Sequence, residues 1–269
     1  MKIVEFKPNP NSKARVVGYL HEKSAETPER TQRPCVVVFP GGGYVYLSDR
    51  EAEPPAMAFY VKGYQVFVLY YSVGDMATEL RPLIDGSLTL MKIRENSKEW
   101  HVLPDKIAVI GFSAGGHVAA SLGTLWDSPE LKKKIDTKGG RNRPDAMILC
   151  YSVLTAGKLT HVDSAKALCG GEPTKAQVEF YSLEKHVDAQ TPPAFLWHTV
   201  NDACVPVENS LMFAEALQKN HISFECHLFP DGCHGSSMCT AEVNTPNPHA
   251  AAWLPLCFEW LGGLFGFQY

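Results

Sequence analysis

The sequence lacks the features that direct a chain to nucleic acid or to a membrane. Its lysine and arginine residues are scattered, and a net charge of −4 disfavours nucleic acid as a partner. Residues 1–8 contain no continuous apolar segment, so we expect a cytoplasmic protein. The apolar run 252–265 is interrupted by Pro255 and Glu259 and is too short to span a bilayer, which predicts a docked terminal helix and no membrane partner.

The chain also lacks the cysteine patterns of a metal site. It has eight cysteines but no CxxC pair and no second ligand cluster at zinc spacing. Cys233 and Cys239 flank His234, yet these groups alone do not make a four-ligand zinc site. We therefore expect no metal, and we expect reduced thiols that fill space in the core.

Strand and helix patterns alternate along the 269 residues, which predicts a single α/β domain with a mostly parallel central sheet and helices on both faces. The apolar run 35–39 predicts a central strand, whereas 15–20 indicates an early, exposed strand. The period-two pattern of 224–228 predicts a half-buried strand near the sheet edge. The other predicted strands are 66–71, 107–110, 146–150 and 194–198, and the predicted helices include 52–62, one opened by Pro82, one after Ser113, one after Pro206, and 252–265.

Residues at about 155–192 interrupt this alternation, because they are rich in loop-forming residues and only weakly helical. An insertion of this size in a compact sheet protein is typical of a lid or a substrate wall. We interpret it as a small cap.

A GxSxG motif, Gly111 to Gly115, lies between a predicted strand and a predicted helix. In this setting the serine occupies a strained turn, where side chains on the flanking glycines would collide with the adjoining strand and helix. Ser113 is therefore the candidate nucleophile. The alternative is a tight turn with a helix-capping serine.

A serine hydroxyl needs a base to accept its proton and a carboxylate to orient that base. Asp202 and His234 each follow a predicted strand and stand in the chain order Ser, Asp, His. The carboxyl ends of parallel strands meet at one sheet edge, so these side chains are predicted to converge there. Asp231 and Glu208 are the competing acids.

Two other histidines lie near these motifs. His117 follows the motif on a helix, and His198 lies inside a predicted strand. We interpret both as core residues rather than as the base.

The loop Pro40-Gly41-Gly42-Gly43-Tyr44 follows the central strand, where an oxyanion hole belongs. Glycines let backbone amides face inward, and fixed amides stabilise the charge of a tetrahedral intermediate. We expect the donors to be the N–H groups of Gly42, Gly43 and Ala114. Aromatic rings suit acyl groups and sugar rings, so the predicted substrate contacts are Tyr44, Tyr46 and Tyr71, although ordinary core packing explains these tyrosines nearly as well.

Together, the motifs at 40–44, 111–117, 197–202 and 229–235 resemble those of α/β-hydrolases, in particular hormone-sensitive-lipase-like esterases and bacterial acetyl-xylan-esterase-like and feruloyl-esterase-like proteins. The resemblance implies a serine carboxylesterase that needs no metal or organic cofactor. It also implies the triad and oxyanion roles given above. Pro40 stands where the lipase-like HGGG motif has histidine, which leaves the register of the donor amides open by one residue.

This resemblance predicts hydrolysis of small, short-acyl esters, including acetylated or feruloylated sugars, and the sequence leaves a homodimer open. One alternative is a serine peptidase similar to prolyl oligopeptidases, although the chain has no propeller-sized domain. Another is a non-catalytic binding protein on a hydrolase scaffold, which predicts the loss of at least one triad residue.

Overall fold

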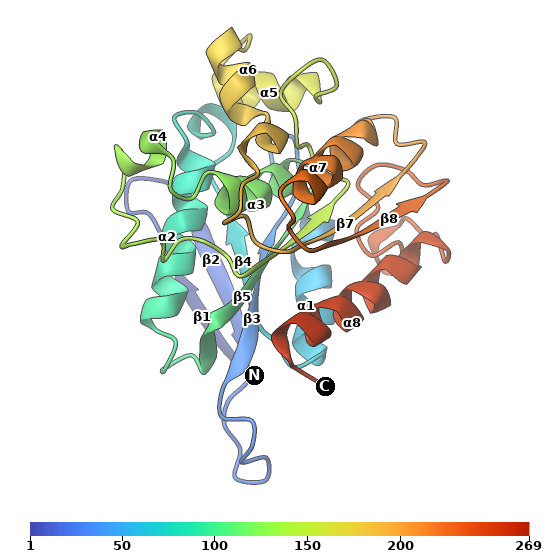
Figure 1. Ribbon diagram of the computed structural model, residues 1–269. Coiled ribbons are helices and arrows are strands. Elements are labelled where there is room, and N and C mark those ends of the chain that lie inside the picture. Colours follow the sequence, from blue (N-terminus) through green and yellow to red (C-terminus); the bar gives the residue numbers. More distant parts are fainter. Residues whose placement is uncertain (269) are drawn as a thin grey trace.

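The computed structural model describes residues 1–268 and shows an eight-stranded sheet with helices on both faces (Figure 1). The strand order is β1-β2-β4-β3-β5-β6-β7-β8, and only β2 runs antiparallel to its neighbours. This confirms the predicted α/β fold with a mostly parallel sheet. The strands are β1 (Lys2–Phe6), β2 (Arg15–Leu20), β3 (Arg33–Phe39), β4 (Gln65–Tyr70), β5 (Val102–Phe112), β6 (Ala146–Cys150), β7 (Ala194–Thr199) and β8 (Phe224–Phe229).

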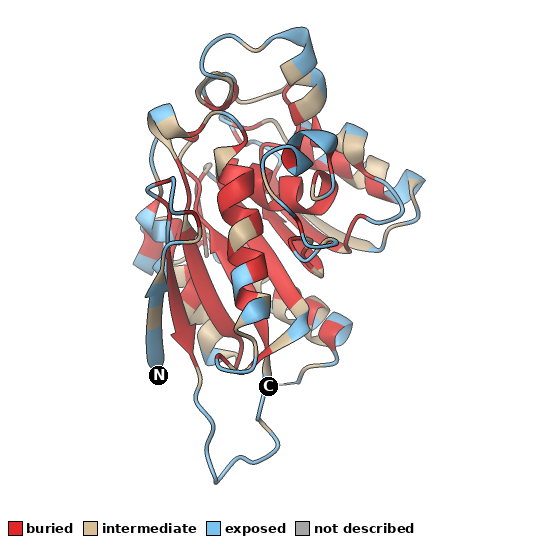
Figure 2. Cartoon of the chain, turned by 90° about the vertical axis from the view of Figure 1, so that its left-hand side faces the viewer, coloured by how far each residue is buried: buried red, intermediate tan, exposed pale blue. Residues whose placement is uncertain are grey.

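Helices cover the sheet in two layers because its inner strands are apolar on both faces. One layer contains α1 and α8, whose Phe59 and Trp253 join a buried cluster with Val38 and Ile110 of the sheet. The other layer contains α2, α3 and α7, and Figure 2 shows the buried strands behind it. The helices are α1 (Glu53–Val61), α2 (Arg81–Glu95), α3 (Ala114–Thr124), α4 (Pro129–Lys132), α5 (Val162–Cys169), α6 (Lys175–Tyr181), α7 (Glu208–Lys219) and α8 (Trp253–Phe265).

The first two strands differ from the sequence-based expectation. Residues 16–20 of β2 are buried, so the prediction of an exposed strand was wrong. The reason is β1, a strand that the sequence analysis missed, which pairs with β2 and covers its outer edge. Phe6 of β1 stacks on Trp100 with ring centroids 5.4 Å apart, and this contact holds the short, half-polar strand on the sheet.

The segment 155–192, which the sequence predicts to be an insertion, contains α5, α6 and the 3-10 turn Leu183–His186 (Figure 1). Capping hydrogen bonds fix the ends of its helices. The side chain of His161 accepts the N–H of Ser164 at the start of α5, which ends at Gly170 in the left-handed conformation. Thr174 and Gln177 form a capping box at the start of α6.

Within residues 1–268, no helix combines the length and apolar character needed to cross a bilayer. In the same range the eight cysteines carry free thiols, and four of them are buried.

Candidate functional site

Ser113 occupies a sharp turn between β5 and α3, with φ of 52° and ψ of −118°. The turn requires glycine on both sides. A Cβ on Gly111 would lie 2.2 Å from the carbonyl oxygen of Gly115, and a Cβ on Gly115 would lie 2.2 Å from that of Phe39. The glycines of the motif therefore permit the close contact of strand, turn and helix that presents the serine.

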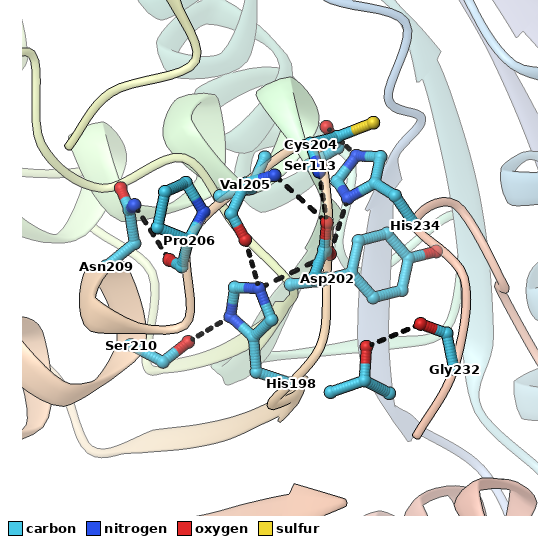
Figure 3. Close-up of polar contacts among 12 residues, drawn as sticks. Ser113, His198, Asp202, Cys204, Val205, Pro206, Asn209, Ser210, Gly232 and His234 are labelled. Carbon is cyan, nitrogen blue, oxygen red and sulfur yellow. Dashed lines mark hydrogen bonds and ion pairs between the residues drawn. The ribbon is translucent and has the colours of Figure 1, made fainter. Parts of the chain in front are cut away.

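Three of the predicted site residues are joined by hydrogen bonds (Figure 3). Oγ of Ser113 lies 2.8 Å from Nε2 of His234, and Nδ1 of His234 lies 2.7 Å from Oδ2 of Asp202. The residues follow β5, β8 and β7, so they meet at the carboxyl edge of the sheet. An imidazole between a hydroxyl and a carboxylate has the geometry needed to accept the hydroxyl proton.

The carboxylate of Asp202 is fully buried but well supplied with donors. Oδ1 accepts the backbone N–H groups of Cys204 and Val205 at 2.8 and 3.0 Å. Burial alone would raise its pKa, but hydrogen bonds from His198 and His234 hold the pKa of Asp202 well below its usual value. The side chain is therefore ionised near neutral pH, and its negative charge faces Nδ1 of His234.

His198 is a buried core residue, as its position within a strand indicates, but it also faces the acid. Its Nε2 lies 3.0 Å from the carbonyl oxygen of Val205 and 3.4 Å from Oδ2 of Asp202 (Figure 3). A carbonyl only accepts, so Nε2 carries the proton, and Nδ1 accepts the hydroxyl of Ser210 at 2.8 Å. Nothing in the sequence pattern indicated this contact with the acid.

The two competing acids do not reach the imidazole. Asp231 accepts a hydrogen bond from Asn201 at 3.1 Å, at the protein surface. Glu208 is exposed in the first turn of α7. Of the three acids weighed from the sequence, only Asp202 hydrogen-bonds to His234.

The glycine loop after β3 lies beside Ser113. Gly42 and Gly43 have φ of +123° and +64°, which a side chain would oppose. Gly41 instead donates its N–H to Oε2 of Glu51 at 3.0 Å. Among the described residues, the amides of Gly42, Gly43 and Ala114 have no acceptor; the two glycines line the pocket beside Ser113, whereas Ala114 is buried behind it.

A second hydrogen-bond network, which the sequence did not indicate, contacts this loop through Glu51. Glu51 is 2% exposed, and its Oε1 accepts the hydroxyl of Tyr151 at 2.7 Å. The same hydroxyl accepts the N–H of Ser237 at 2.8 Å, and the Tyr151 ring packs edge-on to His234 at 5.1 Å. The network thus ties the glycine loop to the loop that carries the imidazole. No motif could have indicated it, because Glu51 and Tyr151 are 100 residues apart.

A pocket of about 390 Å³ opens onto Ser113 and His234. Its wall is formed by the glycine loop, the segment after it, the start of α5 and the loops that carry Asp202 and His234. The lining residues are Gly42, Gly43, Val45, Tyr46, Ser48, Arg50, Glu51, Ser113, His161, Asp163, Cys204, His234 and Gly235.

Of the three tyrosines expected to contact substrate, only Tyr46 lines this pocket, with 60% of its surface exposed. Tyr44 and Tyr71 are each 2% exposed, so the expectation is corrected for both. The hydroxyl of Tyr71 donates to the carbonyl of Pro40 at 2.7 Å, and that of Tyr44 bonds to Nδ1 of His117 at the same distance. Their phenol groups brace the glycine loop from inside because each finds a buried partner.

Comparison with known families identifies the chain. The BD-FAE family matches residues 24–217, about three-quarters of the sequence. The chain belongs to this family. BD-FAE proteins form part of the α/β-hydrolase superfamily, which confirms the superfamily expected from the four motifs.

The relatives of this BD-FAE protein bear the names of esterases and of enzymes of xylan breakdown. Endo-1,4-beta-xylanase B of Butyrivibrio fibrisolvens is 40% identical over 84% of this chain, and the acetylxylan esterase of Xylanibacter ruminicola is 30% identical over 84%. The match covers only 35% and 44% of those two proteins. A crystal structure of an acetyl ester-xyloside bifunctional hydrolase from Caldicellulosiruptor lactoaceticus is 38% identical, with a TM-score of 0.84 over 98% of this chain and 92% of that one.

Proposed function

We propose that this protein is a serine carboxylesterase that hydrolyses small, short-acyl esters. The observation that carries the proposal is the hydrogen-bonded chain from Ser113 through His234 to Asp202, next to three amides that have no acceptor among the described residues. The BD-FAE family and the esterases among its relatives support it.

In the proposed reaction, Oγ of Ser113 attacks the ester carbonyl while Nε2 of His234 accepts its proton. The imidazolium then protonates the leaving alcohol, and an acyl-enzyme remains. Water activated by His234 releases the acid and restores the serine. The amides of Gly42, Gly43 and Ala114 stabilise the oxyanion in both halves, and Asp202 holds the imidazole tautomer.

The insertion at 155–192 is proposed to be the cap of this site. His161 and Asp163 line the pocket, and a Cβ on Gly43 would lie 3.6 Å from Oγ of Ser164. The insertion therefore lies directly against the oxyanion loop. For the alcohol part we propose a sugar, because two relatives are named for acetylated xylan or for an acetyl ester and a xyloside together.

The test compares p-nitrophenyl acetate with a peptide anilide. Wild type is expected to hydrolyse the ester and not the anilide, and Ser113→Ala should lower kcat at least about 10⁴-fold. Ser121→Ala, on the same helix with its hydroxyl bonded to the carbonyl of His117, is the matched control. Ester turnover that persists in Ser113→Ala would remove the serine from its role, and turnover of the anilide alone would favour a peptidase.

A further inference from the structure

His161 lines the pocket from the proposed cap, whereas Ser113 and His234 line it from the carboxyl edge of the sheet. His161 is half-buried and precedes α5, where Nδ1 accepts the N–H of Ser164 at 3.3 Å and lies 2.8 Å from the hydroxyl of the same serine. His161 therefore has two roles, since its Nδ1 caps a helix and the residue also lines the pocket.

The capping contact determines the tautomer of His161. A backbone N–H can only donate, so Nδ1 must carry a free lone pair, and the proton of a neutral ring resides on Nε2. No described residue accepts a hydrogen bond from Nε2. His161 thus adds a side-chain N–H donor without a partner among the described residues to the residues that line the pocket.

The charge state of His161 agrees with this arrangement. Burial, followed by the nearby His234, lowers the pKa of His161, while Asp163 and Asp202 act in the opposite direction. At neutral pH the ring is an uncharged donor, which suits a hydroxyl better than it suits a carboxylate.

We propose that Nε2–H of His161 selects esters whose alcohol part carries a hydroxyl next to the esterified oxygen. The inference rests on the proposed function, in which His234 protonates the leaving oxygen, so the alcohol lies on the His234 side of Ser113. His161 lines that same pocket and is close enough to His234 for their charges to interact. A vicinal hydroxyl is the feature that distinguishes a sugar from a simple alcohol.

The test uses two esters that differ by one hydroxyl, trans-2-hydroxycyclohexyl acetate and cyclohexyl acetate. The measured quantity is the ratio of their kcat/KM values in wild type, His161→Asn and His161→Ala. Asparagine retains an oxygen that caps α5 but has no group at the position of Nε2, whereas alanine loses both. His186→Asn is the matched control, because His186 lies in the same insertion and outside the pocket wall.

We expect the ratio to fall about three- to tenfold in both His161 variants, the effect of one neutral hydrogen bond, and to stay at the wild-type value in His186→Asn. An unchanged ratio in His161→Asn would overturn the inference. A ratio that falls only in His161→Ala would also overturn it, because capping of α5 would then be the whole role. Wild type and Ser113→Ala are also assayed on p-nitrophenyl acetate. If that activity depends on Ser113, an unchanged ratio counts against the His161 inference alone. If it does not depend on Ser113, the proposed function fails, and the His161 inference fails with it.

Discussion

Replacing Asp202 with asparagine preserves the shape of the side chain and removes its charge. The asparagine oxygen is held where Oδ1 accepts the N–H groups of Cys204 and Val205. The new amide nitrogen then faces Nδ1 of His234, which lies 2.7 Å from Oδ2 in the wild type. A donor at that position requires Nδ1 to accept, so the proton moves to Nε2. That is the atom that must receive the proton of Ser113.

The expected loss has two parts. The imidazolium loses a charge-assisted hydrogen bond of about 1.5–3 kcal/mol. The wrong tautomer also removes a general base that contributes about 10²–10⁴-fold. We therefore expect kcat to fall about 10³–10⁴-fold, a barrier higher by about 4–5.5 kcal/mol, as for the same exchange in a Ser-His-Asp protease. KM should change less than about threefold, because Asp202 does not line the pocket.

The assay is steady-state hydrolysis of p-nitrophenyl acetate by Asp202→Asn and by Asp231→Asn. Asp231 is the matched control, because it lies three residues from His234 and contacts Asn201 instead. Thermal unfolding of both variants is measured alongside, since the new amide also faces the Nε2–H of His198. If Asp202→Asn stays within tenfold of wild type while Asp231→Asn loses activity, the wrong acid has been assigned.

Two further predictions test groups outside the hydrogen-bonded chain. Tyr151→Phe removes the hydroxyl that joins Glu51 to Ser237, so we expect a loss of about 1–3 kcal/mol in urea unfolding and a lower kcat on p-nitrophenyl acetate. An unaltered kcat would show that this network does not position the site. Burial lowers the pKa of His117 to about 4, so between pH 6.5 and 4 the unfolded chain binds more protons, and the free energy of unfolding should fall by about 3 kcal/mol as pH decreases through that window. Urea unfolding of His117→Gln should show a flatter pH dependence, and equal slopes in variant and wild type would contradict the assignment.

Much of the fold was predictable because its signals are local. Seven of the eight strands follow from apolar or alternating segments of four to six residues, and the turn at Ser113 follows from glycines two residues away on either side. The missing strand was β1, whose half-polar residues form a strand only because β2 offers a pairing edge. The prediction that β2 is exposed was wrong for the same reason, because β1 pairs with β2 and covers its edge.

The tyrosines show where local signals end. Tyr44, Tyr46 and Tyr71 are chemically alike, yet two brace the loop from inside and one lines the pocket. Which of these happens depends on whether a buried acceptor lies within reach of each hydroxyl. His117 and the carbonyl of Pro40 meet that need for two of them, and neither contact is visible in a pattern of spacing.

The sequence by itself determined the fold class, the order of the three candidate side chains and the glycines that bend the chain around them. These features depend on backbone sterics and on the order of strands, and short segments of the sequence specify both. Only the tertiary structure decided which acid meets His234, which tyrosine reaches the pocket, and that Glu51, Tyr151, His161 and His198 surround the site. Such contacts join residues from separate loops, and their distances follow from the packing of the whole sheet and its helices.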